Sequence, residues 1–413
     1  MRILFASPIG GLGGAELFLL EMLEELRLRA PDWDLHLVAG SDGPLLARAQ
    51  SLGVTCHLEP FPPELAAWGD SSAKTATGSA AGNALARWLK LGPAVLRYRR
   101  RLRALIRRIG PDLVHSNGLK FHALTGLAGC GEARLAWFMH DYLGSRRLLS
   151  RVLPWLARSV DLVWANSQSV ADDIQKLLPS IPVEVLHCGI DLETFAPGPS
   201  EADWLEGQCE PIGNNSPALR IGLVATYARW KGQDLFLQAA AELLRRKPSQ
   251  PVRFYIIGGP IYESAGSQFT RKELTQLASG FGIAEAVRFV PFQIEISRVY
   301  RSLDVVVHAS RHPEPFGRTI LEAMACGRAV IATEAGGAAE IFSADKAAVG
   351  VPPGDVCALS QAMKALVEDA ELRSSLGHKA RVRANEFSRG RMGEKLHSVY
   401  SRPALRREKS KLT

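Results

Sequence analysis

Two glutamates, Glu314 and Glu322, are the residues whose types and spacing point most directly to chemistry. Glu314 follows the apolar, β-branched run Val305–Ala309, which is typical of a strand buried on both faces. A helix expected to begin near Phe316 turns its free backbone N–H groups toward an anion, and Gly317, which has no Cβ, lets a ligand come close. Glu322 stands about two turns along, where a carboxylate can accept hydrogen bonds from sugar hydroxyls. The pattern favours a sugar diphosphate site; the alternative is a pair of surface glutamates on an ordinary helix.

Lys231 and His140 are further candidates for chemistry. Lys231 follows the predicted strand Ile221–Ala225 at a strand–helix junction, where a point charge can balance a diphosphate leaving group without a metal. His140 follows the predicted buried strand Leu135–Met139, with Asp141 beside it to tune its protonation state. Because open α/β sheets bind ligands beyond the carboxyl ends of their strands, we expect both residues to lie in a site.

A glycine-rich loop near the amino terminus has the order of a phosphate cradle. The predicted strand Ile3–Ala6 leads into Gly10–Gly14 and then into an apolar helix, Ala15–Leu28. The loop is not a dinucleotide fingerprint, because Glu16 stands where the third glycine should be, and no phosphate-loop lysine follows. The alternative is a plain tight turn.

The segment Asp32-Trp33-Asp34 has the form by which some sugar-transferring enzymes hold a cation. It precedes the predicted strand Leu35–Ala39, whereas a ligand site should follow a strand. We interpret it as a surface turn.

Repeated units of strand, loop and helix must position these residues. After the helix that carries Glu322 come a second buried strand, Ala329–Thr333, and a tight turn at Gly336-Gly337. This order predicts one unit of an open, parallel α/β sheet. The chain has 413 residues, 46% of them hydrophobic, which is too long for one typical core and suggests two or three.

Composition excludes several classes of protein. No apolar run approaches the ~18 residues of a membrane span, and the start of the chain resembles a strand rather than a signal peptide. The six cysteines form no CxxC pair and no metal spacing, which favours reduced packing residues of a cytoplasmic protein and no bound metal. A net charge of +8 and a pI near 9.3 predict anionic partners. Nucleic acid is not expected among them, because zinc-finger and RNA-binding motifs are absent.

An arginine-rich helix follows an unusual segment. Residues 69–83 are rich in Ser, Ala, Gly and Thr and are predicted to form a loop. Beyond it an apolar stripe recurs at helical spacing (Val95, Tyr98, Leu102, Leu105, Ile106 and Ile109), and arginines take the remaining positions (97, 99, 100, 101, 103, 107 and 108). Such a helix can lie peripherally on an anionic membrane; the alternative is that its stripe covers the sheet.

The paired glutamates resemble those of a known family. Glu314-Pro315-Phe316-Gly317 with Glu322 is similar to the motif of retaining glycosyltransferase family four, and Ala323–Gly327 and Gly336–Glu340 fit that family too. The resemblance covers nearly the whole chain. It implies an α/β protein of the GT-B fold: two Rossmann-like domains whose parallel sheets face across a cleft, with the donor held mainly by the second.

The resemblance also assigns roles to residues. Glu322 would bind the nucleotide ribose, Glu314 the hydroxyls of the donor sugar, and His140 would lie against that sugar. The other residues expected to bind the donor are Gly13, Gly14, Lys231, Phe316, Gly317 and Arg318. On the acceptor side we expect Gly11, His115, Arg146 and Arg147.

One position departs from the family. Five residues before Lys231 the family usually carries an arginine, whereas this chain has Thr226. Arg229 is close enough in sequence to take that role, as a second catalytic cation. The alternative is that Lys231 works with helix dipoles alone.

The predicted organisation follows the resemblance. The expected parts are an amino-terminal acceptor-side domain over residues 1–195, a linker over 196–217, a nucleotide-sugar-binding domain over 218–386, and a tail over 387–413 that crosses back onto the first domain.

The implied activity is transfer of a hexose-type sugar from a nucleotide diphosphate sugar to a hydroxyl of a glycan or lipid-linked acceptor, with retained configuration and with no cofactor. Two alternatives stay open: a nucleotide-sugar epimerase of the same fold, and a non-catalytic module that binds a membrane or a partner.

Overall fold

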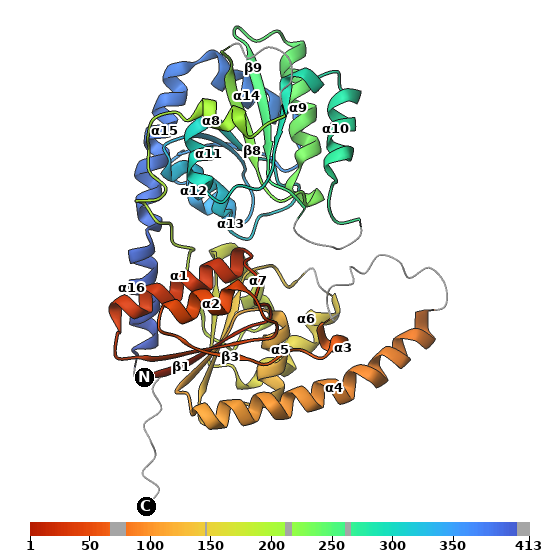
Figure 1. Ribbon diagram of the computed structural model, residues 1–413, viewed down its shortest axis with the longest axis vertical. Helices are drawn as coiled ribbons and strands as arrows, with labels where there is room; N and C mark the ends of the chain where they lie inside the picture. Colours follow the sequence, from red (N-terminus) through yellow and green to blue (C-terminus); the bar gives the residue numbers. More distant parts are fainter. Residues whose placement is uncertain (67–79, 145–146, 211–216, 261–265, 403–413) are drawn as a thin grey trace, which may run out of the picture. The chain divides into compact units, whose positions relative to one another are not determined.

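The chain folds into two compact units, each built on a parallel sheet (Figure 1). The computed structural model describes residues 1–66, 80–144, 147–210, 217–260 and 266–402, with only the backbone at 80–90 and 147–149. Unit 1 comprises residues 1–189 together with the chain from Arg389 onward, and unit 2 comprises Ile190–Ser388.

Unit 1 contains a sheet that, within the described residues, has seven strands in the order β3-β2-β1-β4-β5-β6-β7, every neighbouring pair parallel. The strands are β1 (Arg2–Ser7), β2 (Asp34–Ala39), β3 (Thr55–Leu58), β4 (Leu113–Ser116), β5 (Arg134–Met139), β6 (Leu162–Ala165) and β7 (Val183–Val185). The helices are α1 (Gly14–Arg29), α2 (Pro44–Ser51), α3 (Pro63–Ala66), α4 (Ala80–Ile109), α5 (Leu119–Ala128), α6 (Arg147–Leu156), α7 (Gln168–Leu177) and α16 (Arg389–Tyr400), with a short 3₁₀ turn at Ala157–Ser159.

Unit 2 repeats this plan with a sheet of six strands in its described part, in the order β10-β9-β8-β11-β12-β13. The strands are β8 (Leu219–Val224), β9 (Val252–Ile257), β10 (Val287–Val290), β11 (Val305–His308), β12 (Ala329–Thr333) and β13 (Val349–Val351). The helices are α8 (Ala202–Gly207), α9 (Gln233–Arg245), α10 (Arg271–Gly280), α11 (Ile296–Ser302), α12 (Arg318–Ala325), α13 (Gly337–Phe342), α14 (Val356–Glu368) and α15 (Ala370–Ala384). Figure 1 shows α9 and α10 on one side of this sheet and α11 and α12 on the other.

Helix α4 buries the apolar stripe that the sequence predicts. Tyr98, Leu102, Leu105 and Ile106 are all at most 2% exposed and belong to one core cluster of unit 1. The stripe therefore covers the sheet, which supports the structural interpretation of this helix. The helix begins at Ala80, so residues 80–83 are helical and their prediction as loop is wrong; residues 69–79 lie outside the described residues.

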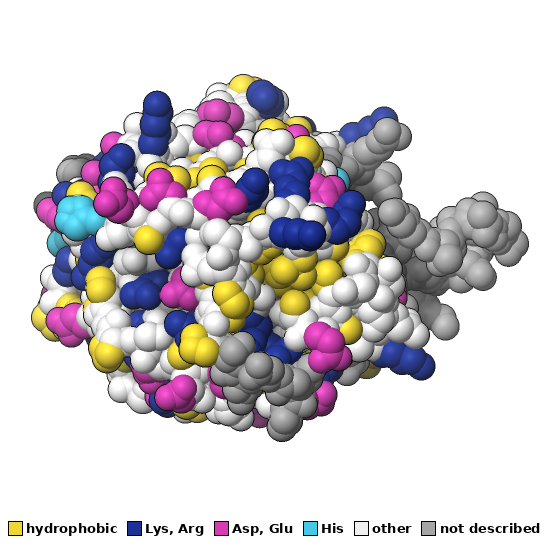
Figure 2. Space-filling model, turned by 90° about the horizontal axis from the view of Figure 1, so that it is seen from above, with side chains coloured by type: hydrophobic (Ala, Val, Ile, Leu, Met, Phe, Trp, Pro, Cys, Tyr) yellow, Lys and Arg dark blue, Asp and Glu magenta, His cyan; other side chains and the backbone are white. Residues whose placement is uncertain are grey.

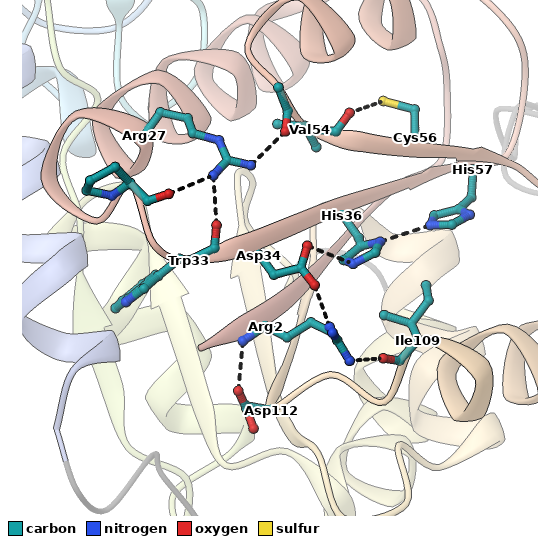
Figure 3. Close-up of polar contacts among 12 residues, drawn as sticks. Arg2, Arg27, Trp33, Asp34, His36, Val54, Cys56, His57, Ile109 and Asp112 are labelled. Carbon is teal, nitrogen blue, oxygen red and sulfur yellow. Dashed lines mark hydrogen bonds and ion pairs between the residues drawn. The ribbon is translucent and has the colours of Figure 1, made fainter.

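The amino ends of the strands in unit 1 are joined by a polar network (Figure 3). The guanidinium of Arg2 donates to Asp34 (2.6 Å) and to the carbonyl of Ile109 (2.7 Å), which ties β1 to the start of β2 and to the end of α4. His36 lies 3.2 Å from Asp34 and 3.1 Å from His57 on the neighbouring strand. Asp32 and Trp33 lie in the turn before β2, as predicted, whereas Asp34 is the first residue of the strand and its carboxylate accepts from Arg2.

The chain crosses between the units at different residues from those predicted. It leaves unit 1 after Gly189 and returns at Arg389, and Ile190 pairs with Ser388 beside the crossing. Segment 196–217 is not a plain linker, because α8 lies in it and belongs to unit 2. Leu205 of α8 is fully buried, and Glu206 accepts a hydrogen bond from Arg253 (2.5 Å).

Helix α16 belongs to unit 1 although it follows unit 2 in the sequence. The guanidinium of Arg29 at the end of α1 donates to the carbonyl of Gly390 (2.6 Å), and Arg389 forms an ion pair with Glu24 of the same helix. Met392, Leu396 and Val399 of α16 are buried.

The surface of the molecule carries both signs of charge. On the face shown in Figure 2, basic and acidic side chains are interspersed, with apolar side chains between them. The net charge of +8 is therefore not concentrated on that face.

All six cysteines are free. No helix within the described ranges combines the length and the apolar character needed to cross a membrane.

Candidate functional site

Glu314 is the centre of the polar cluster in unit 2. The ammonium of Lys231 donates to both carboxylate oxygens, at 2.9 Å and 3.0 Å. His308 Nε2 lies 3.0 Å from Oε2, and Ser310 Oγ donates to the same oxygen at 2.8 Å. The side chain of Glu314 is only 9% exposed and that of Lys231 17%. The sequence predicted a site here, and the structure brings these two residues into direct contact.

The cluster keeps Glu314 ionised. Burial alone would raise the pKa of this carboxyl, but the charge of Lys231 and the hydrogen bond from His308 outweigh burial and hold the pKa well below its usual range. An ionised carboxylate only accepts hydrogen bonds, so Glu314 cannot serve as a proton donor near neutral pH. It can accept from ligand hydroxyls and orient the ammonium beside it.

Backbone geometry at the carboxyl edge of the sheet places these side chains. The loop with Glu314 pairs with the turn after β12, where the N–H of Gly337 donates to the carbonyl of Glu314 (2.8 Å). Gly232, just after Lys231, has φ +75°, and a Cβ there would lie 2.0 Å from the carbonyl oxygen of Ala309. Only glycine fits this turn, so the short helix Arg229–Lys231 is pressed against the end of β11.

Glu322 lies about one turn into α12, whose first residue is Arg318. The hydroxyl of Tyr300, in α11, donates to Glu322 Oε2 at 2.8 Å, and Arg318 lies 3.8 Å from Oε1. Burial raises the pKa of Tyr300, so its hydroxyl stays protonated and remains a donor. The carboxylate of Glu322 is thus oriented by a rigid donor from the neighbouring helix.

Gly317 and Phe316 form the entry to α12. Gly317 caps the helix with φ +105°, a conformation that side chains rarely adopt. Phe316 is 3% exposed and packs edge-on against Phe387, 6.2 Å between ring centroids. Its role in the structure is packing of the loop, and Arg318 is the first residue of the helix.

Arg229 is not directed toward the Lys231 pair. Its guanidinium donates to Glu273 of α10 (2.5 Å) and to the carbonyl of Gly266 (3.1 Å), and it lies 4.3 Å from the ring centre of Phe269. This arrangement favours the alternative in which Lys231 is the acting cation. Lys231 itself lies 4.0 Å from the ring centre of Trp230.

His140 in unit 1 is a neutral imidazole whose Nε2 carries the proton. The amide of Asn117 donates to the carbonyl of Ala15 (3.3 Å), so its oxygen faces His140 Nε2 at 2.7 Å and accepts a hydrogen bond from the N–H there. Burial lowers the pKa of His140 to about 3. A neutral ring that donates from Nε2 offers only the lone pair of Nδ1 to a ligand, so in this tautomer His140 could accept a hydrogen bond from a sugar hydroxyl but not donate one. The carbonyl of His140 accepts from Asn166 (3.2 Å).

His115 is misplaced by the sequence analysis. It is fully buried within β4, where its Nδ1 is hydrogen-bonded to the hydroxyl of Tyr400. The same hydroxyl accepts a hydrogen bond from Trp164 (3.1 Å). It therefore joins the sheet to α16 and is not exposed to an acceptor. Burial also lowers the pKa of His115 and of His122 to about 3. We call these two residues and His140 the neutral histidines of unit 1.

The glycine loop is partly filled by the protein's own carboxylate. The N–H of Gly13 donates to Glu16 Oε2 (3.2 Å), which completes a capping box at the start of α1. Glu16 is 5% exposed, and burial raises the pKa of its carboxyl. Gly11 and Gly14 border open space within the described part of the chain. A ligand at this loop would therefore meet Gly11 and Gly14 rather than the N–H of Gly13.

The two arginines predicted on the acceptor side cannot be placed as side chains. Arg146 lies outside the described residues, and of Arg147, the first residue of α6, only the backbone lies within them. Across the described ranges, no group of three or more His, Cys, Asp or Glu side chains is arranged to hold a metal ion.

The sequence analysis missed His308, Ser310, Tyr300 and Asn117. His308 and Ser310 flank the end of a predicted strand, and that position was the available signal for both. Asn117 follows β4 in the same way. Tyr300 lies 22 residues before the carboxylate it orients, and nothing in the local pattern marks it as a partner.

Comparisons with known proteins agree with this geometry. Residues 12–194 match the family model described as Glycosyltransferase Family 4, and residues 210–383 match that described as Glycosyl transferases group 1. D-inositol 3-phosphate glycosyltransferase of Gordonia bronchialis is 31% identical over 249 residues, which are 59% of this chain and 52% of the relative. The enzyme of the same name from Frankia alni is 30% identical over 294 residues, 69% of this chain and 67% of the relative.

Solved structures match over almost the whole chain. HepE of Anabaena, solved in complex with UDP, has a TM-score of 0.76 at 24% identity, covering 97% of this chain and 100% of its own. Sucrose-phosphate synthase of Thermosynechococcus elongatus has a TM-score of 0.73 at 19% identity, covering 97% and 98%. These likenesses concern the fold, and the sequence match to the first inositol phosphate enzyme spans about half of that relative.

One assignment follows from three findings. Two family models match adjoining parts of the chain, a relative is matched over two thirds of its length, and each unit has a Rossmann-like parallel sheet. The chain belongs to glycosyltransferase family four and has the GT-B fold.

Proposed function

We propose that the protein is a retaining glycosyltransferase that moves a hexose-type sugar from a nucleotide diphosphate sugar to a hydroxyl group. The observation that carries the proposal is the Lys231–Glu314 contact at the edge of the sheet, followed two turns along by Glu322. In this proposal Glu322 binds the ribose, Glu314 binds hydroxyls of the sugar, and Lys231 faces the diphosphate.

The reaction breaks the bond between the anomeric carbon and the diphosphate oxygen and forms a bond from the acceptor oxygen to that carbon. The proton of the acceptor hydroxyl leaves with the diphosphate. Negative charge grows on the departing oxygen, and Lys231 stabilises it without a metal. Positioned cations of this kind contribute about 2.7–4 kcal/mol to lowering a barrier.

The substrates follow from the relatives as far as their names go. HepE was solved with UDP, and the bacterial relatives carry D-inositol 3-phosphate, a phosphorylated polyol, in their name. We propose a nucleoside diphosphate sugar as donor and a glycan or lipid-linked hydroxyl as acceptor. Gly11 and Gly14, in the glycine loop of unit 1, would border the acceptor.

A donor screen tests the proposal. Nucleotide sugars are added singly, thermal unfolding is followed, and each donor that raises the melting temperature is incubated with hydroxyl acceptors and analysed by mass spectrometry and NMR. We expect a transferred sugar with retained anomeric configuration, in the presence of a chelator as well. An isomerised nucleotide sugar without transfer would identify an epimerase instead, and the absence of any turnover would indicate a binding module.

We also propose that the outer face of α4 meets an anionic membrane, which would carry a lipid-linked acceptor. Arginines 97, 100, 103, 107 and 108 are exposed, whereas Arg101 is paired with Glu59. The apolar stripe of α4 is buried in the core, so attachment would be electrostatic and would weaken with salt. Each arginine near such a surface contributes about 1 kcal/mol.

Vesicle co-sedimentation tests this surface. We expect the parent to sediment with vesicles containing anionic lipid at low salt, and to stay in the supernatant with neutral vesicles or at high salt. A variant with Arg100, Arg103 and Arg107 replaced by Gln should bind at least tenfold more weakly, while one with Arg101→Gln should lose less. Equal recovery of parent and triple variant in the supernatant would leave α4 a purely structural role.

A further inference from the structure

His308 is a buried side chain to which the proposed function gives no role. It is the last residue of β11, is 6% exposed, and its Nε2 lies 3.0 Å from Glu314 Oε2. Ser310 Oγ lies 3.1 Å from the same nitrogen and 2.8 Å from the same carboxylate oxygen. His308 therefore belongs to the cluster that holds Glu314, and it does so from the interior.

The backbone that carries His308 is fixed on two sides. His308 pairs in register with Ala332 of β12, and the hydroxyl of Thr333 donates to the carbonyls of His308 (3.3 Å) and Ser310 (3.0 Å). An imidazole on such a strand has little freedom. Lys231, by contrast, reaches Glu314 through a flexible four-carbon chain, so it cannot by itself set the plane of the carboxylate.

The proton arrangement follows from the chemistry of the partners. Glu314 is ionised and can only accept, so the hydrogen bond requires an N–H at His308 Nε2. The other ring nitrogen, Nδ1, is buried and has no hydrogen-bond partner within the described residues. Through Nε2 the ring is hydrogen-bonded to Glu314, a side chain that the proposed function uses.

We propose that His308 is a positioning residue of the transfer reaction. By donating from Nε2 to Glu314 Oε2, it sets the orientation of the carboxylate, so that Glu314 and Lys231 meet the donor sugar and the diphosphate in the reactive arrangement. The inference rests on the proposed function, because it acts through Glu314. His308 itself does not touch the donor.

Two amide substitutions separate positioning from packing. The side-chain amide of Gln can place an N–H near the position of Nε2, whereas the shorter Asn can place one only near that of Nδ1. We expect His308→Gln to keep turnover within about threefold of the parent and His308→Asn to lose 10- to 100-fold, since small misplacements of catalytic groups cost that much. Ser310→Ala removes the second donor to Oε2 and should lose less than His308→Asn.

Binding of the free nucleoside diphosphate provides the control readout. In the proposed function it depends on Glu322, the start of α12 and Lys231, none of which the variants replace, so calorimetric titration should give affinities within about twofold of the parent for all three variants. The KM for the donor sugar nucleotide and kcat should change in His308→Asn while the affinity for the nucleotide does not. A purely structural role would instead lower both together with the melting temperature.

The outcomes are distinct. Equal turnover of His308→Gln and His308→Asn, whether high or low, overturns the positioning role and leaves the proposed function intact. Loss of nucleotide affinity in parallel with turnover in both variants also overturns it. A parent protein that transfers no sugar and is protected by no nucleotide sugar overturns the proposed function, and the role of His308 with it.

Discussion

Replacing Lys231 by Met is the sharpest test of the buried pair. The substitution keeps the length and apolar part of the side chain but leaves the ionised Glu314, 9% exposed, without its cation. Removing one partner of a buried ion pair costs about 3–5 kcal/mol. His308 and Ser310 still donate to Glu314 in the variant, so we expect the lower end, about 3 kcal/mol.

The expected loss is large enough to measure in the presence of both units. For a unit of this size, each kcal/mol shifts the melting temperature by about 2–4 °C, so the transition of unit 2 should fall by roughly 6–12 °C. Glu314→Gln should cost about 2 kcal/mol, because Lys231 is 17% exposed and can turn toward solvent. In the double variant neither charge is stranded, and we expect a loss of about 2 kcal/mol rather than the sum of about 5 kcal/mol.

The pH dependence supplies a second check. In the parent the pKa of Glu314 is depressed, so its contribution to stability is complete above the unfolded value of about 4.3 and is lost as pH falls further. In Lys231→Met burial acts on Glu314 without the opposing charge, and its pKa rises. The difference in stability between parent and variant should therefore narrow as the pH is lowered below about 5.

Scanning calorimetry of the four proteins at pH 7 and at about pH 4 measures these effects. Additive losses in the double variant would show that the two side chains are not coupled. A Lys231→Met protein within 1 kcal/mol of the parent at pH 7 would refute the description of Glu314 as a buried charge that needs its cation.

Three further predictions follow from other parts of the site. Tyr300→Phe should weaken binding of the nucleoside diphosphate about five- to tenfold, and Glu322→Ala more than tenfold, by calorimetric titration; unchanged affinity in Glu322→Ala rejects the ribose role. Arg229→Ala should keep near-parental turnover because its guanidinium is paired with α10, while Lys231→Ala should lose 10²- to 10³-fold in steady-state kinetics. Equal losses would mean that both cations serve the leaving group. The neutral histidines of unit 1 have folded pKa values near 3, below the unfolded value of about 6.5, so the unfolded chain binds more protons in between. The free energy of unfolding of unit 1 should fall by roughly 4 kcal/mol per pH unit as the pH decreases from 6 to 4, measured by urea unfolding. A slope that corresponds to uptake of less than one proton on unfolding contradicts the burial of these histidines as neutral groups.

Hydrophobic periodicity and turn residues predicted the buried strands and the amphipathic helix of the fold, but not every boundary between elements. The strand Ala329–Thr333 was predicted with the bounds it has, because its apolar run is buried on both faces and ends at glycine turns. The arginine helix was predicted from its stripe, but its start was missed because small polar residues preceding it look like loop. The segment with α8 looked like a linker because it carries a single fully buried leucine, Leu205, among polar residues and prolines.

The site was predicted to the extent that its residues lie next to strand ends. Glu314 and Lys231 were found in this way, but their mutual contact joins positions 83 residues apart, and no sequence spacing shows it. Positions at the end of a strand were also the source of error. His115 lies one residue before the end of β4, and its side chain is in the core. Asn117, the first residue after the strand, is the one that reaches the edge of the sheet and contacts His140.

The pairing of Lys231 with Glu314 bears on how such a site would favour the transition state over the bound donor. Within the Lys231–Glu314 pair the two charges balance, so the pair adds little net attraction for a diphosphate before reaction. As the glycosidic bond breaks, the leaving oxygen gains charge and competes with Glu314 for the ammonium. Glu314 can yield part of that interaction because His308 and Ser310 continue to donate to it. The attraction of Lys231 for the diphosphate then grows as charge develops, and an interaction that is stronger in the transition state than in the ground state is the kind that raises kcat. A site with Lys231 alone would hold donor and departing diphosphate nearly as tightly as the transition state, and under the proposed function the carboxylate with its two interior donors would prevent this.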